Sequence, residues 1–171
     1  MMGWAMEITR RTDYAVRLIS GLVRSQGEPL SVKTAAEEYD VPYSFARSIQ
    51  HDLVLSGIIT SQRGASGGML LNIDPSKVTM LELVESVQGP ISVAVCAREK
   101  DYCPREKACE FHHVWVGADK LLKNYLSSVT IQDLVDGAKS PSISSELAKE
   151  DAFTPEKMHH VPCQGCSTLH D

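Results

Sequence analysis

Residues 42–72 read PYSFARSIQHDLVLSGIITSQRGASGGMLLN, and this stretch decides the fold. Its first part begins at Pro42, a residue that suits the first turn of a helix, and runs to about Ser56 before Gly57 stops it. Apolar residues at four-residue spacing predict which side of this helix faces the core, and they are Phe45, Ile49 and Leu53. The pattern predicts one amphipathic helix.

The second part of the stretch predicts a β-hairpin, because two short apolar runs, residues 58–61 and 69–72, flank the glycine-rich segment 62–68. Upstream, an apolar stripe over about Thr9–Ser25 predicts a first helix, and Ser31 is a suitable N-cap for a short second helix. Three helices and a hairpin, with the second and third helices joined by a few residues, follow the order of a winged helix-turn-helix. We therefore expect a mainly α fold with a small β-wing.

The chain beyond the hairpin is expected to add helices. Thr79 and Glu82 form a capping-box pattern, which predicts a helix to about Gln88. A longer helix is expected over about 110–127. Its exposed apolar stripe should be buried against the same helix of a second copy, so we expect a C-terminal dimerisation helix. The expected regions are a DNA-binding domain (1–88), a cysteine-bearing loop (89–111), the dimerisation helix with a short following helix (112–137) and a mostly disordered tail (138–171).

Composition limits the class of protein. The 171 residues carry a net charge of −5, and residues 1–75 hold seven Lys and Arg against eight Asp and Glu, so DNA binding must rest on a few well-placed cations. No apolar run approaches the roughly 18–20 residues that span a bilayer, and the start lacks the apolar stretch of a signal peptide, so we expect a cytoplasmic protein. Catalytic and nucleotide-binding motifs are missing, so we expect no enzyme.

The helix-turn-helix order predicts which residues meet DNA, because the first turns of its second helix enter the major groove. With the expected stripe facing inward, the outward residues are Tyr43, Ser44, Arg47, Gln50 and His51. Arg47 suits guanine and Gln50 suits adenine. At the wing tip, Arg63 is placed to enter the minor groove. Arg10 and Arg11 are expected to contact phosphates, the alternative being a solvated helix face.

Five cysteines are present, and they are Cys96, Cys103, Cys109, Cys163 and Cys166. An odd number without a signal peptide argues against a disulfide scaffold. Thiolates suit iron–sulfur clusters and zinc, and the wide spacing of the first three differs from the C-x2-C pairs of structural zinc sites. A redox disulfide or a zinc site in the loop stays open. The pair Cys163 and Cys166 is a candidate metal or thiol site.

These features together resemble the IscR/NsrR type of bacterial iron–sulfur and nitric-oxide-responsive winged-helix regulators, over about residues 6–135. The matching segments are Ile8-Thr9, Asp13-Tyr14-Ala15-Val16-Arg17, Pro42 with Phe45, Leu53-Val54 with Ser56-Gly57, Arg63-Gly64-Ala65 with Gly67-Gly68, Thr79 with Leu83, the three loop cysteines, and Thr130-Ile131 with Asp133-Leu134. The resemblance implies a homodimer that binds palindromic double-stranded DNA and whose long helices cross. It also implies a cluster, [2Fe–2S] or [4Fe–4S], on Cys96, Cys103 and Cys109.

The resemblance leaves the fourth cluster ligand open. His112 matches the position where the IscR type supplies a histidine, and Asp13 matches the position where the NsrR type supplies a carboxylate from the other subunit. His113 is a neighbouring possibility, and the two tail cysteines are a further one. Two departures from the family pattern stand out: six residues rather than five separate Cys96 from Cys103, and Arg47 replaces a carboxylate, which implies a different operator.

The sequence therefore predicts a sensor of redox state, iron–sulfur status or nitric oxide. In this sensor, a change at the cysteine-bearing loop alters the spacing of the two DNA-binding domains of the dimer. Three alternatives stay open. The first is a cluster-free regulator that uses zinc or cysteine oxidation. The second is a small metalloprotein or electron carrier, and the third is an adaptor that has lost DNA binding, against which Arg47 and Arg63 argue.

Overall fold

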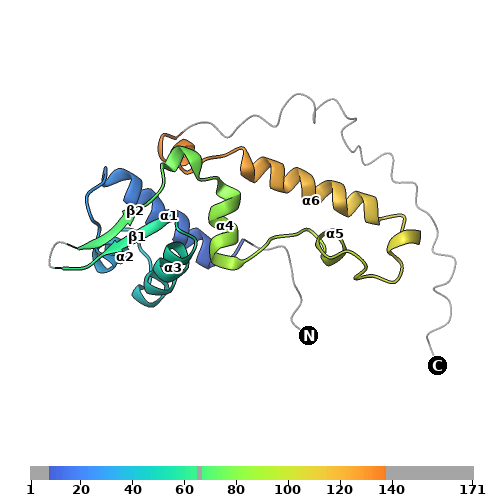
Figure 1. The fold of residues 1–171 in the computed structure, drawn as a ribbon, viewed down its shortest axis with the longest axis horizontal. Coiled ribbons are helices and arrows are strands. Elements are labelled where there is room, and N and C mark those ends of the chain that lie inside the picture. The colour runs from blue at the N-terminus through green and yellow to red at the C-terminus, as the bar shows by residue number, and fades with distance from the viewer. Residues whose placement is uncertain (1–7, 65–66, 138–171) are drawn as a thin grey trace. The chain divides into compact units, whose positions relative to one another are not determined.

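The computed structural model describes residues 8–64 and 67–137, so the tail with Cys163 and Cys166 lies outside the described residues. Its elements, in order, are α1 (Arg10–Arg24), α2 (Val32–Glu38), α3 (Tyr43–Leu55), β1 (Ile59–Gln62), β2 (Gly68–Leu71), the 3-10 turn η1 (Pro75–Lys77), α4 (Met80–Gln88), α5 (Val95–Arg98), the 3-10 turn η2 (Glu106–Ala108), α6 (His112–Ser127) and α7 (Ile131–Val135) (Figure 1). The prediction of a mainly α fold with a small β-wing is confirmed.

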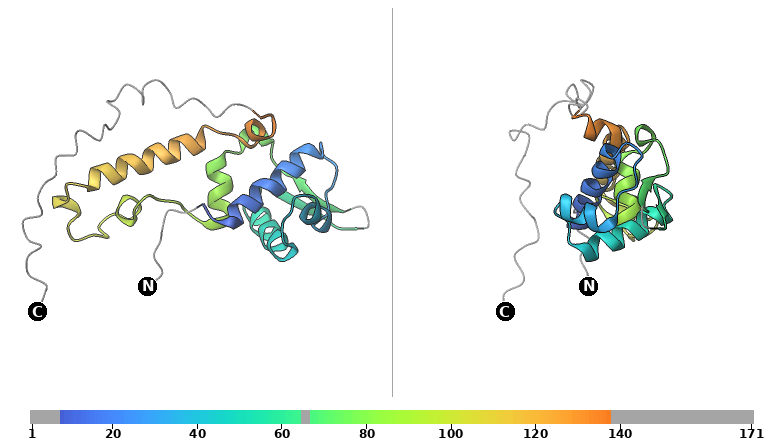
Figure 2. Two further views of the ribbon diagram at one scale, coloured as in Figure 1. Left: turned by 180° about the vertical axis from the view of Figure 1, so that it is seen from behind. Right: turned by 90° about the vertical axis from the view of Figure 1, so that its left-hand side faces the viewer.

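Helix α1 is the central helix of the winged-helix body, which we define as residues 8–88 together with α7. The hydroxyl of Thr9 caps it by accepting a hydrogen bond from the amide of Thr12. Its inward stripe is buried, and the residues are Thr12, Ala15, Leu18, Ile19, Gly21 and Leu22. Burial of each Leu or Ile side chain contributes about 1.5–3 kcal/mol. This stripe packs α1 against α2, α3, α4 and α7 (Figure 2).

Helices α2 and α3 form the helix-turn-helix. Ser31 caps α2 as predicted, because its hydroxyl accepts a hydrogen bond from the amide of Thr34. The chain then turns at Asp40, which adopts the left-handed conformation with φ of 56°. The amide of Val41 closes the turn by donating to the carbonyl of Ala36 at 2.9 Å. Both of these apolar side chains are buried, so the turn is anchored in the core.

The predicted core stripe of α3 is wrong at one position. Phe45 is 41% exposed, and the residue buried with Ile49 and Leu53 is Ala46. Residues 46, 49 and 53 follow the three- and four-residue spacing of one helix face, whereas Phe45 lies at the edge of that face. There its ring packs edge-on against the ring of Tyr14 in α1, with 5.5 Å between centroids.

The wing is a two-stranded antiparallel sheet whose register places Ile59 of β1 opposite Leu71 of β2. Leu30, just before α2, bridges to Met69 through two backbone hydrogen bonds of 3.0 and 2.8 Å. This bridge presses the chain against Gly68, where an added Cβ would lie 2.6 Å from the Leu30 backbone. The glycine is therefore required by the packing of the wing on its own body.

Helix α4 and the end of the described chain complete the body. The capping box of Thr79 and Glu82 is confirmed, with both of its hydrogen bonds present. After α6 the chain returns to the body, because the amide of Ile131 donates to the carbonyl of Val78 at 2.9 Å. Ile131 is buried in the same core cluster as the α1 stripe, so α7 packs as part of the body.

Residues 89–111, here called the cysteine segment, fold differently. The sequence predicted a loop, but α5 and η2 add helical turns of four and three residues, which are too short to produce an apolar period. The segment leads into α6, which begins at His112, two residues later than predicted. Helix α6 contacts α4 and α5. None of the helices in the described ranges is long and apolar enough to cross a membrane.

Candidate DNA-binding surface and metal-ligating segment

The outward face of α3 is the candidate DNA-reading surface. Its exposed side chains with a hydrogen-bonding group in the first three turns are Tyr43, Ser44, Arg47, Ser48 and His51. The sequence analysis missed Ser48. It placed Phe45 in the core, and this choice rotated the predicted outward face of the helix toward Gln50. With Ala46 inward, Ser48 moves toward the middle of the exposed face. Arg47 and His51 make no hydrogen bond or ion pair within the described residues, so both side chains are available to a ligand.

Gln50 lies at the junction between α3 and the wing. Its side-chain amide donates a hydrogen bond of 2.8 Å to the hydroxyl of Ser61 in β1. This bond joins α3 to the wing and uses one of the two N–H donors of Gln50, which leaves the other donor and the carbonyl oxygen. The adenine contact expected of Gln50 stays a prediction, and its observed role is to hold two DNA-facing elements together.

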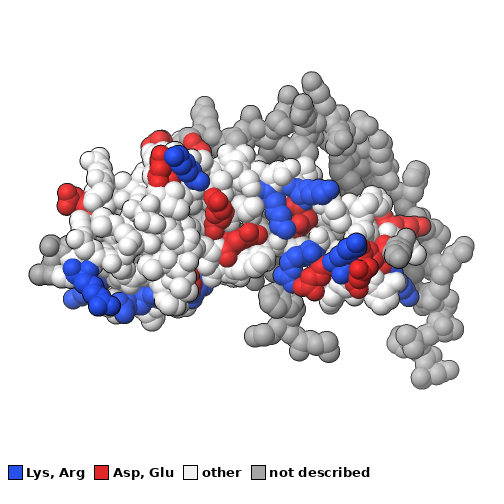
Figure 3. Space-filling view, viewed as in Figure 1, with Lys and Arg blue, Asp and Glu red and all other residues white. Residues whose placement is uncertain are grey.

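Several cations of the winged-helix body lie near α3 and the wing, although Figure 3 also shows one at the opposite edge. Figure 3 shows Lys and Arg side chains along the lower edge of this end of the molecule, near α3 and the wing. Arg63 is exposed directly after β1, and Arg10 is exposed at the start of α1. Because the chain has a net charge of −5, any phosphate contact has to use locally placed cations such as these and not the overall charge.

Arg11 differs from its neighbour Arg10, because its guanidinium is already bonded within the chain. Its Nε donates to the carbonyl of Val87 at 3.1 Å, and its Nη2 donates to the hydroxyl of Ser48 at 2.9 Å. The same nitrogen forms an ion pair with Asp52. The side chain is 29% exposed. The expected phosphate contact of Arg11 is untested, and these bonds compete with it.

The three cysteines of the cysteine segment are free thiols and half-buried. Cys96 lies in α5, Cys103 precedes η2 and Cys109 ends η2. No three His, Cys, Asp or Glu side chains in the described ranges are close enough together to hold a metal ion. The chain thus places the three thiols on one short segment without assembling them, and a common metal centre requires the segment to close around it.

His112 is the one described residue with a buried side-chain nitrogen or oxygen that lacks a hydrogen-bond partner. The atom is Nδ1, whereas Nε2 lies 3.7 Å from a carboxylate oxygen of Glu106. A buried polar atom without a partner costs roughly 1–3 kcal/mol. The amide of His112 also donates to the carbonyl of Cys109 at 3.3 Å, which ties this histidine to the third cysteine. Its neighbour His113 is exposed.

Asp13, the alternative fourth ligand, is differently placed. Its carboxylate forms an ion pair of 2.8 Å with Arg17 on the next turn of α1, and its side chain is 52% exposed. Arg17 also lies 5.8 Å from the centroid of the Tyr14 ring. Asp13 is therefore a surface carboxylate with a partner of its own. The donor set that fits a thiolate-bound iron centre is three cysteines with an unpartnered imidazole nitrogen.

Asp119 of α6 anchors the start of the cysteine segment. Its carboxylate accepts a hydrogen bond of 2.9 Å from the amide of Val93 and forms an ion pair of 2.9 Å with Lys123. Burial opposes ionisation, since the side chain is only 7% exposed. Hydrogen bonds from Lys123, the Val93 amide and the Ser92 side chain outweigh that burial and lower the pKa of the Asp119 carboxyl. The charged form therefore fastens residues 92–93 to the helix.

Helix α6 carries an apolar face that nothing in the described chain covers. The exposed apolar residues at and before this helix are Phe111, Val114, Trp115 and Leu121. They recur at three-, four- and seven-residue spacing, so they share one side of the helix. Charged residues occur on the rest of the helix, and Asp119 is its one fully buried residue. Such a face is a candidate interaction surface.

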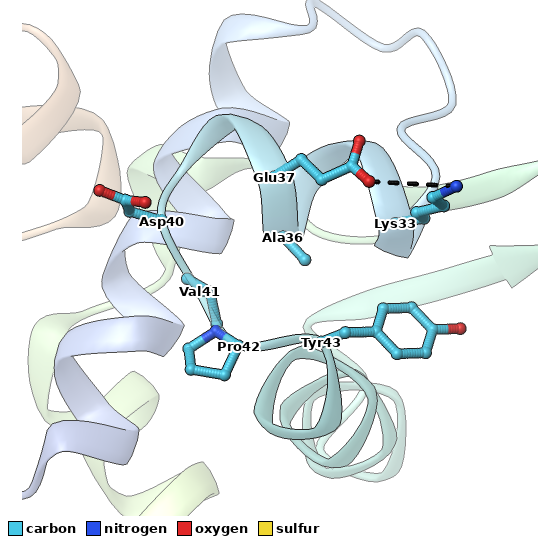
Figure 4. Close-up of a pocket in the computed structure, with 7 residues that line it drawn as sticks. All are labelled: Lys33, Ala36, Glu37, Asp40, Val41, Pro42 and Tyr43. Carbon is cyan, nitrogen blue, oxygen red and sulfur yellow. Dashed lines mark ion pairs between the residues drawn. The ribbon is translucent and has the colours of Figure 1, made fainter.

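An open pocket of about 520 Å³ lies beside the helix-turn-helix turn, away from the cysteine segment. It is lined by Lys33, Ala36, Glu37, Asp40, Val41, Pro42 and Tyr43. Figure 4 shows Lys33 and Glu37 paired along α2, with Pro42 and Tyr43 on the opposite side at the start of α3. No thiol or imidazole reaches it, so it contains none of the soft ligands that iron or zinc prefers.

The helix-turn-helix, its hairpin wing and the outward cations define a winged-helix DNA-binding protein. A family model described as Rrf2, an iron-dependent transcriptional regulator, matches residues 8–137. The chain therefore belongs to the Rrf2 family, and it is a DNA-binding transcriptional regulator rather than an enzyme. The predicted resemblance to this family is confirmed.

Individual relatives agree with this assignment. The chain is 30% identical to the HTH-type transcriptional repressor NsrR of Streptomyces coelicolor over 80% of this chain and 93% of the relative. It is 26% identical to the regulator CymR of Bacillus subtilis over 75% of this chain and 89% of the relative. A transcriptional regulator from Listeria innocua has the same fold, with a TM-score of 0.65 at 23% identity, over 84% of this chain and 95% of that chain.

Proposed function

We propose that this regulator controls transcription through an iron–sulfur cluster bound by Cys96, Cys103, Cys109 and His112. The observation that carries the proposal is the buried Nδ1 of His112, which has no partner and follows a segment with three free thiols. The description of the matched family as iron-dependent supports it. His112 is preferred to Asp13 as the fourth ligand because Asp13 already pairs with Arg17.

The cysteine segment has the properties of a sensor. A bound cluster, [2Fe–2S] or [4Fe–4S], supplies iron–sulfur bonds that respond to oxidants, nitric oxide and iron supply. The residues of the chain do the rest: the thiolates draw α5 and η2 together, and the Asp119 carboxylate holds residues 92–93 on α6. Without a group bound in common, the three thiolates would no longer hold α5 and η2 together, and the change in order of the cysteine segment would reach α6, because the segment leads into that helix.

We propose that α6 forms the dimer interface through its uncovered apolar face and that the two copies read a palindromic operator. A twofold dimer presents two α3 helices to half-sites on one face of the DNA. We assign DNA contacts to Tyr43, Ser44, Arg47, Gln50 and His51 of α3, to Arg63 of the wing and to Arg10 of α1. Residues up to 88 would then bind DNA, 89–112 the cluster and 113–127 the partner copy, in the cytoplasm where the DNA lies.

The proposal is tested with protein purified without air after expression with iron and sulfide supplied. Native mass spectrometry measures the mass of the cluster and the dimer together, and visible absorption measures cluster content. Cys103→Ala and His112→Ala should each lose or destabilise the cluster, whereas His113→Ala, the exposed neighbour, should keep it. A colourless, metal-free wild-type dimer would refute the proposal and favour a cluster-free sensor. A zinc-only mass would favour a zinc site at the same thiols.

The response to the signal is a separate measurement. Operator affinity of the wild-type protein is compared before and after oxidant or nitric oxide, with a duplex that the protein selects from a randomised library. The proposal predicts a change of affinity that Cys103→Ala abolishes. An equal response in wild type and Cys103→Ala would show that the cysteine segment does not control binding.

A further inference from the structure

Arg11 and Arg10 are adjacent in sequence but have opposite surroundings. Arg10 is exposed at the start of α1 and has no hydrogen bond or ion pair in the described part of the chain. Arg11 is largely enclosed and bonds to three groups on two other helices: Ser48 and Asp52 of α3, and the carbonyl of Val87 in α4. A long flexible side chain loses conformational entropy when it is fixed in this way, so the three bonds have to act together.

The contacts on α3 place Arg11 at the edge of the reading face. Asp52 follows His51 and lies one helical turn beyond Ser48, on the side of α3 that faces α1. A carboxylate at this edge would repel the DNA phosphates if it were unpaired, and it is 24% exposed. The guanidinium cancels this charge and, by binding Ser48 on the preceding turn, fixes the rotation of α3 about its axis.

The contact on α4 extends the same junction. The carbonyl of Val87 is among the last four of α4, which have no partner within the helix. Next to it, the side-chain oxygen of Gln88 accepts hydrogen bonds from the backbone and hydroxyl of Thr9 and from the hydroxyl of Thr12. The start of α1 is thereby fastened to the end of α4, and Arg11 continues the connection to α3.

We propose that Arg11 is a positioning residue that sets the recognition helix α3 against α1 and α4 and neutralises Asp52, and that it is not a phosphate contact. A planar guanidinium with donors on several nitrogens can bind the carbonyl, hydroxyl and carboxylate at once, which a lysine ammonium on a thin stem cannot do in the same geometry. The proposal depends on DNA binding alone and not on the cluster.

The test compares Arg11→Gln, Asp52→Asn, the double variant and Arg10→Gln with the wild-type full-length protein. Fluorescence anisotropy measures affinity for the library-selected duplex over a range of salt concentrations, and circular dichroism checks that each variant folds. Arg11→Gln should weaken binding about tenfold, and Asp52→Asn in the same protein should restore only the part of that loss that comes from the unpaired carboxylate, since the bonds to Ser48 and Val87 stay broken. Arg10→Gln, the matched control, should lower the salt slope by about one.

Two results separate positioning from phosphate contact. Arg11→Lys keeps the charge, so a phosphate contact would keep near-wild-type affinity, whereas the positioning role predicts a clear loss with little change in salt slope. The proposal is overturned if the double variant binds no more tightly than Arg11→Gln and both have a salt slope lower by about one. If Arg11→Gln does not fold, Arg11→Lys carries the comparison alone, because it keeps a positive charge beside Asp52; near-wild-type affinity of this variant would overturn the proposal.

Discussion

The winged-helix body encloses one hydrophobic core drawn from α1, α2, α3, both strands, α4 and α7. The cysteine segment, in contrast, has Ile91 as its one buried apolar side chain among the residues whose burial is described. In the body, packing fixes the reading surface whatever the chain binds. In the segment, too little apolar surface is buried to select one conformation, so ligands of the thiols can decide it. The four predictions below test this difference.

The largest effect is expected from Leu53→Ala in the core of α3. The side chain is 1% exposed beside Ile49, so its loss leaves a cavity and should lower the free energy of unfolding by about 2–5 kcal/mol. Urea denaturation followed by circular dichroism measures it. Cys103→Ala in metal-free protein is the comparison and should change the value by less than about 1 kcal/mol. Equal losses would mean that the two regions share one core.

Gly68→Ala tests whether the wing is held as tightly as the helices. The new Cβ would lie 2.6 Å from the Leu30 backbone, which cannot yield without breaking the bridge to Met69, so a loss of about 1–3 kcal/mol is expected. Gly117→Ala is the matched control in α6, where a Cβ meets no atom within 4 Å. That variant should be neutral or slightly stabilising. Thermal unfolding of the two variants side by side makes the measurement.

Leu121→Glu tests whether the uncovered face of α6 is an interface. Leu121 is 47% exposed, so the body should fold normally while a buried charge in a dimer weakens association about tenfold or more. Sedimentation equilibrium measures the dissociation constant. Lys120→Gln, an exposed neighbour with the same change of charge, is the control. Similar dissociation constants for wild type and Leu121→Glu would place the interface elsewhere.

The smallest effect is expected from pH at Asp119. Its folded pKa is lowered, so its contribution to stability is present above the unfolded pKa, near 3.8, and is lost as pH falls through the folded value. Acidification through the folded pKa should therefore lower the protection factor of the Val93 amide, which is its exchange rate relative to an unfolded amide at the same pH. Asp119→Asn should already exchange faster at neutral pH and respond less to acid. Identical pH profiles would mean that the carboxylate does not hold residues 92–93.

Local sequence patterns determined most of the body. The capping residues Ser31 and Thr79 each accept the predicted hydrogen bond, because a cap needs only a side-chain oxygen three residues from an amide. The hairpin was also predictable, because its two strands are close together in the sequence and are separated only by a glycine-rich segment. The family membership also followed from the order of these motifs together with the three cysteines.

The tertiary structure decided what depends on partners distant in sequence. Phe45 left the core because Tyr14, thirty-one positions earlier, meets its ring at the surface, and Ala46 allows close approach of the helices. Arg11 became enclosed because Asp52 and Val87 converge on it from α3 and α4. That His112 Nδ1 is buried without a hydrogen-bond partner can also be seen only in the folded chain. Spacing along the chain determines which face a residue occupies, whereas the contacts between faces depend on how the helices pack.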